Sequence, residues 1–171
     1  MEEKKDLFDL AFEFVLRMEG GPTNDPHDPG GSTRWGISQK NHPEVDLVTL
    51  TKEGAKEIYR REYWDKCGCD RLPPAVAFFL FDMSVNQGVA SAVRSLQASV
   101  GAQMDGVVGP NTEAAARRLK PDATLCLFAA ERAEKYARLV SAEPRLMMYV
   151  VGWMRRVMSC LKESLRIAEV A

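Results

Sequence analysis

Hydrophobic residues recur along the chain at the spacing of one face of an α-helix. Between Leu7 and Met18 the apolar side chains fall three and four positions apart, which predicts an amphipathic helix. The same spacing predicts further helices at about residues 51–65, 91–100, 111–119, 122–141 and 146–167. Residues 73–88 are apolar on nearly every side, as in a helix buried at the centre of a fold. The pattern predicts a mainly α fold.

Glycine, proline and short polar residues mark the ends of these helices. Gly20, Gly21 and Pro22 end the first helix, because glycine accepts the left-handed cap and proline cannot continue the helix. Residues 20–36 are dense in such residues, which predicts a functional loop or a short irregular hairpin there.

Composition and charge exclude several classes of protein. A chain of 171 residues, 46% of them hydrophobic, can bury a core without disulfide or metal support. The formal net charge of −1 lacks the basic footprint of a nucleic-acid-binding protein, so we expect no nucleic-acid partner. No apolar run has the form of a signal peptide or the length of a membrane span. We expect a monomer that is made in the cytoplasm and is not inserted in a membrane.

The spacing of cysteine and histidine argues against a metal site. The pair Cys67 and Cys69 is too closely spaced for a zinc knuckle, and no histidine is near it. His27 lies between Asp25 and Asp28, but three ligands within four residues rarely converge on one ion. We predict no metal, no cofactor and free thiols.

Glu19 is the first candidate for chemistry. It follows an apolar helix and directly precedes two glycines. The negative end of the helix and apolar neighbours both disfavour an ionised carboxylate, and a carboxyl that keeps its proton can act as a general acid. The alternative is an exposed glutamate at a frayed helix end.

Asp28 lies nine residues after Glu19, in a polar loop where it should stay ionised. Two carboxyls in opposed environments suit acid–base cleavage of an acetal. The hydroxyl of Thr33 could hold a water beside them. A turn formed by aspartate and proline explains the same loop without catalysis.

The string from Glu19 to Ser38, EGGPTNDPHDPGGSTRWGIS, resembles the signature of glycoside hydrolase family 108, the N-acetylmuramidases of phage endolysins and related bacterial proteins. Further matches follow in order at Ile58-Tyr59, Tyr63-Trp64, Phe81-Asp82, Val85-Asn86, Leu96-Gln97, Asp105 to Thr112, and Gly152-Trp153. The resemblance covers about residues 7–160. It departs at Pro22, where the family often has an aromatic residue, and this leaves the sugar preference open.

The resemblance implies a lysozyme-like fold that cleaves the β-1,4 bond between N-acetylmuramic acid and N-acetylglucosamine in bacterial peptidoglycan. Glu19 maps to the family's catalytic glutamate, while Asp28 and Thr33 match by motif position. It also implies a muramidase region at 1–95 and a peptidoglycan-binding-like region at 96–171, packed into one domain. Such a protein would reach the wall through a separate pore or export route.

Three further residues are candidates for substrate binding. Trp35 and Tyr63 offer aromatic faces on which sugar rings stack, although core packing also explains them. Asn86 either bonds an N-acetyl group or caps its helix. The segment Leu96–Thr112 similarly either contacts the wall or forms a scaffold turn.

Two rival functions remain open on the sequence. A lytic transglycosylase also places a glutamate at a helix end, but it needs no carboxylate to activate water. A non-catalytic wall-binding or regulatory protein could keep the same fold, since fold does not fix function. Asp28 and Thr33 favour hydrolysis over both.

Overall fold

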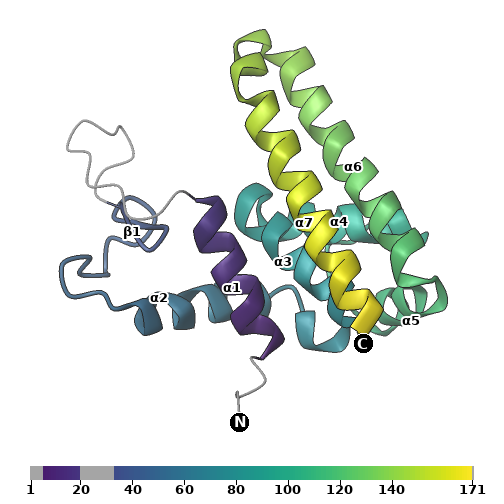
Figure 1. The fold of residues 1–171 in the computed structure, drawn as a ribbon, viewed down its shortest axis with the longest axis horizontal. Coiled ribbons are helices and arrows are strands. Elements are labelled where there is room, and N and C mark those ends of the chain that lie inside the picture. The colour runs from purple at the N-terminus through teal and green to yellow at the C-terminus, as the bar shows by residue number, and fades with distance from the viewer. Residues whose placement is uncertain (1–5, 20–32, 171) are drawn as a thin grey trace. The chain divides into compact units, whose positions relative to one another are not determined.

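A computed structural model describes residues 6–19 and 33–170, and most of them are helical (Figure 1). The chain divides into two compact units, Met1–Glu62 and Tyr63–Ala171, and each is described by itself. The mainly α fold predicted from the hydrophobic pattern is confirmed.

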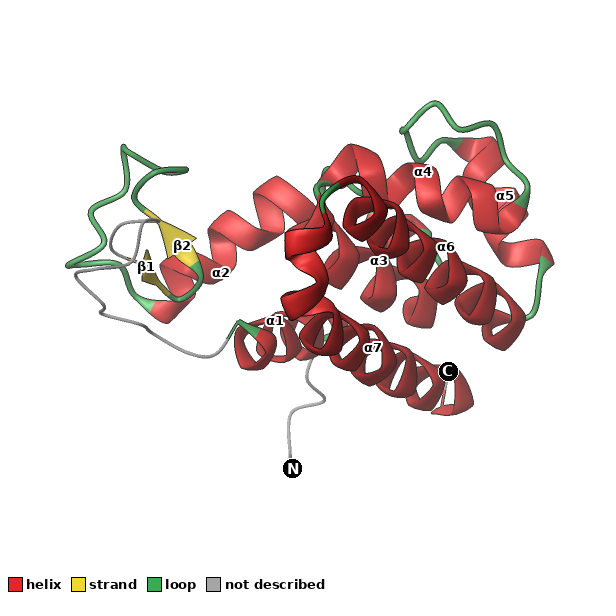
Figure 2. Ribbon diagram, turned by 90° about the horizontal axis from the view of Figure 1, so that it is seen from above, coloured by secondary structure: helices red, strands yellow, loops and turns green. Residues whose placement is uncertain are grey.

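The first unit contains two helices and one short hairpin. Helix α1 spans Leu7–Met18 and α2 spans Lys52–Tyr59, while strands β1 (Thr33–Arg34) and β2 (Ile37–Ser38) pair antiparallel (Figure 2). The predicted bounds of α1 are confirmed. The hairpin occupies the end of the predicted loop, and residues 20–32 lie outside the described residues.

α1 and α2 contact each other through one buried face and one charged face. Phe12 meets the ring of Tyr59 edge-on, with the ring centres 5.4 Å apart. Three ion pairs join the charged faces: Asp6 to Arg60, Asp9 to Lys56, and Glu13 to Lys52. Partly exposed ion pairs contribute at most about 1 kcal/mol each, so this packing depends on the buried aromatic contact as well as on the charged face.

The second unit is built around α3, Pro74–Gln87. Every residue from Ala75 to Ser84 is buried, which confirms the predicted central helix. The other helices of this unit are α4 (Val89–Val100), α5 (Pro110–Arg118), α6 (Pro121–Ala142) and α7 (Val150–Val170). α3 contacts α4, α6 and α7, so its apolar surface is covered from several sides.

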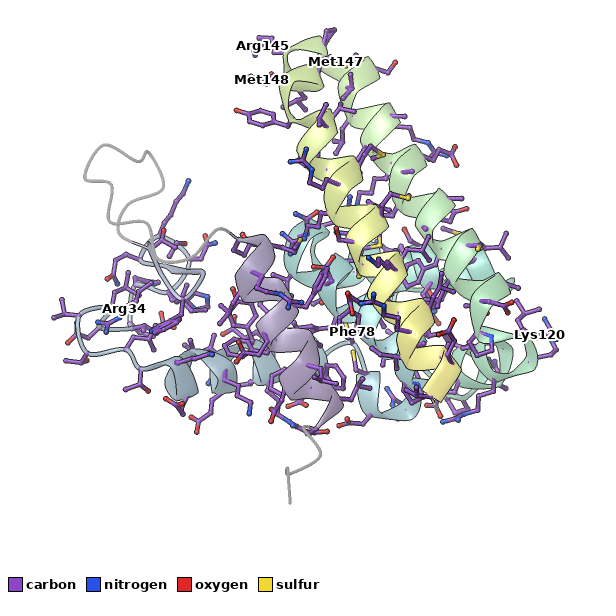
Figure 3. The ribbon with its side chains drawn as sticks, in the orientation of Figure 1. Arg34, Phe78, Lys120, Arg145, Met147 and Met148 are labelled. Carbon is purple, nitrogen blue, oxygen red and sulfur yellow. The ribbon has the colours of Figure 1, made fainter. Side chains whose placement is uncertain are left out.

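α6 and α7 form a long antiparallel hairpin (Figure 1). A 3-10 segment, Pro144–Tyr149, joins them. Arg145, Met147 and Met148 lie in this connection and are exposed (Figure 3).

A buried charge cluster ties α3 to both helices of that hairpin. Asp82 Oδ2 accepts a hydrogen bond from Arg132 Nη1 at 2.6 Å, and Asp82 Oδ1 accepts one from Arg156 Nε at 3.0 Å. Arg132 is fully buried and Asp82 is 1% exposed. One carboxylate therefore holds two arginines that come from different helices.

Two predicted helix boundaries are wrong. The helix expected over 51–65 stops at Tyr59, because Arg60–Trp64 follows as a π-helical turn. The helix expected from Leu146 begins at Val150, because the residues before it are 3-10. Over one or two turns, the apolar residues of a 3-10 helix or a π-helix are spaced much as in an α-helix. The hydrophobic pattern alone therefore does not distinguish the three helix types.

Candidate active site

Glu19 directly follows α1, as predicted. Its backbone N–H donates to the carbonyl of Val15 at 3.0 Å and so completes the last turn of the helix. Phe14 and Val15 are buried, whereas Glu19 is exposed. The carboxyl thus extends from the end of a buried helix, and burial among apolar residues, which the sequence suggested, is not observed.

The hairpin turn has an unusual backbone. Trp35 and Gly36 connect β1 to β2, and both have positive φ, 54° and 76°. This is the pattern of a type I′ turn, which matches the twist of a two-residue hairpin. A bulky residue such as tryptophan rarely adopts positive φ, and such strain is often retained at functional sites.

Arg34 fastens this hairpin to the following loop. Its Nη1 donates to the carbonyl of Leu47 at 3.1 Å and also to the carbonyl of Val48. Arg34 is the last residue of β1 and is labelled in Figure 3. The turn is therefore held by a side chain as well as by the short strand pair.

Gly36 brings the hairpin turn close to Tyr59 and Glu19. A Cβ atom at position 36 would overlap the hydroxyl oxygen of Tyr59 and would lie 3.9 Å from Cγ of Glu19. Tyr59 is 2% exposed, so its hydroxyl is held at a buried position beside the turn. The turn, the tyrosine and the glutamate form one cluster, which we call the Glu19 cluster.

Thr33 and Trp35 belong to the same hairpin. Thr33 begins β1 opposite Ser38 and is half-buried. Trp35 is also half-buried, and its indole Nε1 is buried without a hydrogen-bond partner among the residues that the structure describes. Asp28 and His27 lie outside the described residues.

The other two predicted substrate-binding residues, Tyr63 and Asn86, belong to the second unit. Tyr63 is half-buried, and Asn86 is exposed in the last turn of α3. The side-chain oxygen of Asn86 accepts a hydrogen bond from the hydroxyl of Tyr136. Substrate binding by both residues stays a prediction.

Sequence reasoning missed two members of the Glu19 cluster. Tyr59 was named only in the family match Ile58-Tyr59, and Gly36 only as part of the family string. The signal for Gly36 is its place after a tryptophan between two short strands, since a two-residue hairpin turn favours glycine at its second position. Nothing in the local pattern indicates the hydroxyl of Tyr59.

The Asp-Gly motif of the second unit builds its own loop. Nε2 of buried Gln97 donates to Asp105 Oδ1 at 2.6 Å and to Thr112 Oγ1 at 3.1 Å. Oε1 of Gln97 accepts from the backbone N–H of Gly106 at 2.9 Å. These bonds favour a scaffold turn over wall contact for the segment Leu96–Thr112, because its polar side chains bond to one another and to the backbone of the loop.

Hydrogen bonds from Gln97 and from the backbone N–H of Val107 hold the pKa of Asp105 below its ordinary value. Across residues 6–19 and 33–170, no group of three or more His, Cys, Asp or Glu side chains could hold a metal ion. In the same part of the chain, no helix combines the length and apolarity that crossing a membrane requires.

Comparisons with known proteins divide the chain near the end of α3. A family model described as Glycosyl hydrolase 108 matches residues 12–88, and one described as Predicted Peptidoglycan domain matches residues 91–158. The predicted boundary at residue 95 stays a prediction. The two compact units divide after Glu62.

The solved structure of SagA from Brucella abortus is similar over nearly its whole length. It is 31% identical, with a TM-score of 0.80, and the alignment covers 94% of this chain and 95% of that one. No curated protein matches the chain. The chain is a glycoside hydrolase with peptidoglycan as its partner. It belongs to the glycosyl hydrolase 108 family, as the string from Glu19 to Ser38 predicted.

Proposed function

We propose that the chain hydrolyses the β-1,4 bond between N-acetylmuramic acid and N-acetylglucosamine of peptidoglycan, with Glu19 as the general acid. The observation that carries this proposal is the Glu19 cluster: a carboxyl at the end of a buried helix, beside a strained turn. An acid at a rigid helix end is well positioned for a substrate that lies across the turn.

In the proposed reaction, Glu19 gives its proton to the glycosidic oxygen as the bond to the anomeric carbon of N-acetylmuramic acid breaks. The N-acetylglucosamine side leaves as an alcohol, and water supplies the hydroxyl at the anomeric carbon. Asp28 either removes the proton from that water or stabilises the oxocarbenium-like state. Thr33 positions the water, and Trp35 offers an aromatic face to a sugar ring.

The first prediction is that Glu19→Gln folds normally and releases reducing ends from purified cell wall at least about 100-fold more slowly. The matched control is Glu57→Gln, which removes an exposed carboxyl of the same unit from α2. Circular dichroism and thermal unfolding establish that both variants fold. A Glu19→Gln protein with the activity of the control would refute the role of Glu19.

Mass spectrometry of the borohydride-reduced products identifies the bond. Muramitol at the new ends agrees with the proposal, whereas glucosaminitol means that the other β-1,4 bond is cut. Anhydro-muropeptides would identify a lytic transglycosylase. Binding to wall without any new ends would identify a non-catalytic protein.

A further inference from the structure

A cleft of about 660 Å³ opens in the second unit between the start of α4 and the middle of α6. The side chains that line it include Gln87, Arg94, Met104, Glu131, Lys135 and Arg138. The Glu19 cluster contributes none of its lining residues. This cleft is therefore a second candidate binding site.

Lys135 is a partly buried cation in this cleft. Burial lowers the pKa of its ammonium group, and no carboxylate forms an ion pair with it in the described part of the chain. The adjacent Glu134 instead pairs with Arg138 at 2.6 Å. A ligand carboxylate would supply the counter-charge that Lys135 lacks.

Gln87 provides an unused amide at the same place. Both its side-chain nitrogen and its side-chain oxygen are buried, and neither has a hydrogen-bond partner within the described residues. Leaving a buried donor and a buried acceptor unpaired is unfavourable. A rotation of the side chain towards the cleft would let the amide pair with a peptide group, which offers one acceptor and one donor.

The chemistry of the cleft suits a peptide better than a glycan. Sugar sites present aromatic faces to pyranose rings, and no aromatic side chain is among the described residues that line this cleft. Its charged groups have both signs, since Glu131 and Glu134 line it together with Arg94, Lys135 and Arg138. Free carboxylates, amide groups and an amine occur together in the stem peptides of peptidoglycan.

We propose that this cleft binds the stem peptide of peptidoglycan, with Lys135 pairing a peptide carboxylate and Gln87 a peptide amide. The site would hold the wall by its peptide while the first unit acts on the glycan. The inference rests on peptidoglycan as the partner of this chain, but it does not depend on which glycosidic bond is cut.

The test measures binding to the full chain by calorimetry, with a synthetic stem tetrapeptide that carries free carboxylates. The same tetrapeptide with amidated carboxyls and a peptide-free N-acetylglucosamine tetramer are the comparison ligands. Lys135→Gln should raise the Kd of the free tetrapeptide about fivefold, as expected for one partly exposed ion pair. Lys162→Gln, which removes an exposed lysine of α7, should leave it unchanged.

A second variant separates binding from stability. Gln87→Met removes an unpaired amide, so the variant should be at least as stable as the wild type and yet bind the tetrapeptide more weakly. Equal binding by Lys135→Gln and wild type, or no binding of the tetrapeptide at all, overturns the proposal. If the amidated and the free tetrapeptide bind with equal affinity, the proposed pairing of Lys135 with a peptide carboxylate is wrong.

This test also stands apart from the proposed hydrolysis. The tetrapeptide has no glycosidic bond, so Glu19→Gln should bind it like the wild type. If Glu19→Gln keeps lytic activity, the proposed catalytic role fails while the peptide site is unaffected. If Lys135→Gln instead weakens only the sugar tetramer, the cleft is a glycan site and the peptide assignment is wrong.

Discussion

Trp35 occupies a backbone conformation that suits asparagine or glycine better than tryptophan. Its φ of 54° places a large side chain in the left-handed region, at a cost of about 1–3 kcal/mol. The partner of Trp35 in the turn is Gly36, and Asn-Gly is the preferred pair for a type I′ turn. A tryptophan at this strained position, next to the Gly36 that approaches Glu19, is consistent with a role in binding substrate.

The second prediction follows from this strain. Trp35→Asn should leave the free energy of unfolding unchanged or slightly higher, because relief of strain offsets the lost burial of a half-exposed ring. The rate of wall hydrolysis should fall about threefold to tenfold, as expected for the loss of one aromatic face. Urea denaturation and a reducing-end assay measure the two effects. A parallel loss of stability and activity would mean that Trp35 only packs.

The third prediction concerns the close approach of Gly36 to Tyr59. In Gly36→Ala the new methyl group would overlap the tyrosine hydroxyl and strain a positive-φ position, so we expect a loss of about 1–2 kcal/mol of stability and lower activity. Adding Tyr59→Phe removes the overlapping oxygen. The double variant should therefore lose less stability than the two single changes added together; strictly additive losses would show that the two positions do not touch.

At the residue scale, the sequence predicted Glu19 at a helix end and, as one of two alternatives, a short hairpin in the segment that follows it. It did not predict the approach of Tyr59 to the turn, since this contact joins Gly36 and Tyr59, which lie 23 positions apart in different elements. Local spacing shows that Tyr59 faces inward. It does not show what the hydroxyl meets there.

At the scale of the secondary-structure elements, the side-chain amide of Gln97 holds the loop between α4 and α5 through its hydrogen bonds. Both polar atoms of the Gln97 side chain bond to this loop or to α5, and Asp105 also accepts from the N–H of Val107 at 2.9 Å. The sequence predicted a scaffold turn as one alternative for the segment Leu96–Thr112, and the dipeptide Asp105-Gly106 is typical of such a turn. It did not predict that a glutamine on the preceding helix would hold the turn in place.

The fourth prediction is a pH dependence of this loop. The hydrogen bonds lower the pKa of Asp105 below its ordinary value of 3.8, so they favour the folded state while the carboxylate is ionised. This stabilisation is complete above the unfolded pKa and is lost as the pH falls through the lower, folded pKa. The stability difference between wild type and Asp105→Asn should be constant from pH 5 to 7 and should shrink below about pH 4.

Urea denaturation at each pH measures that difference. Asp122→Asn, an exposed aspartate at the start of α6, is the control for general effects of charge. A difference that stays constant down to pH 2.5 would show that the Asp105 carboxylate is not held by these bonds in its ionised form.

On the scale of the whole molecule, the sequence predicted which segments are helical but not which helices meet. The apolar run of α3 indicated a central helix, because no polar face remained for solvent. The convergence of Arg132 and Arg156 on Asp82 could not be predicted, since the partners lie 50 and 74 residues away. Asp82 itself interrupts an apolar run, and that is the one local sign that something pairs with it.

The fifth prediction tests whether the cluster of Asp82, Arg132 and Arg156 adds to the free energy of unfolding or only determines how α3, α6 and α7 pack together. Asp82→Asn leaves two buried arginines without a counter-charge and should cost about 3–5 kcal/mol. The triple variant Asp82→Leu, Arg132→Met and Arg156→Met removes all three charges and should cost much less, because desolvation of the charges offsets most of their attraction. Urea denaturation compares the two proteins with the wild type. If the triple variant is as unstable as Asp82→Asn, the cluster stabilises the fold by its full attraction, and the arrangement of α3, α6 and α7 depends on it.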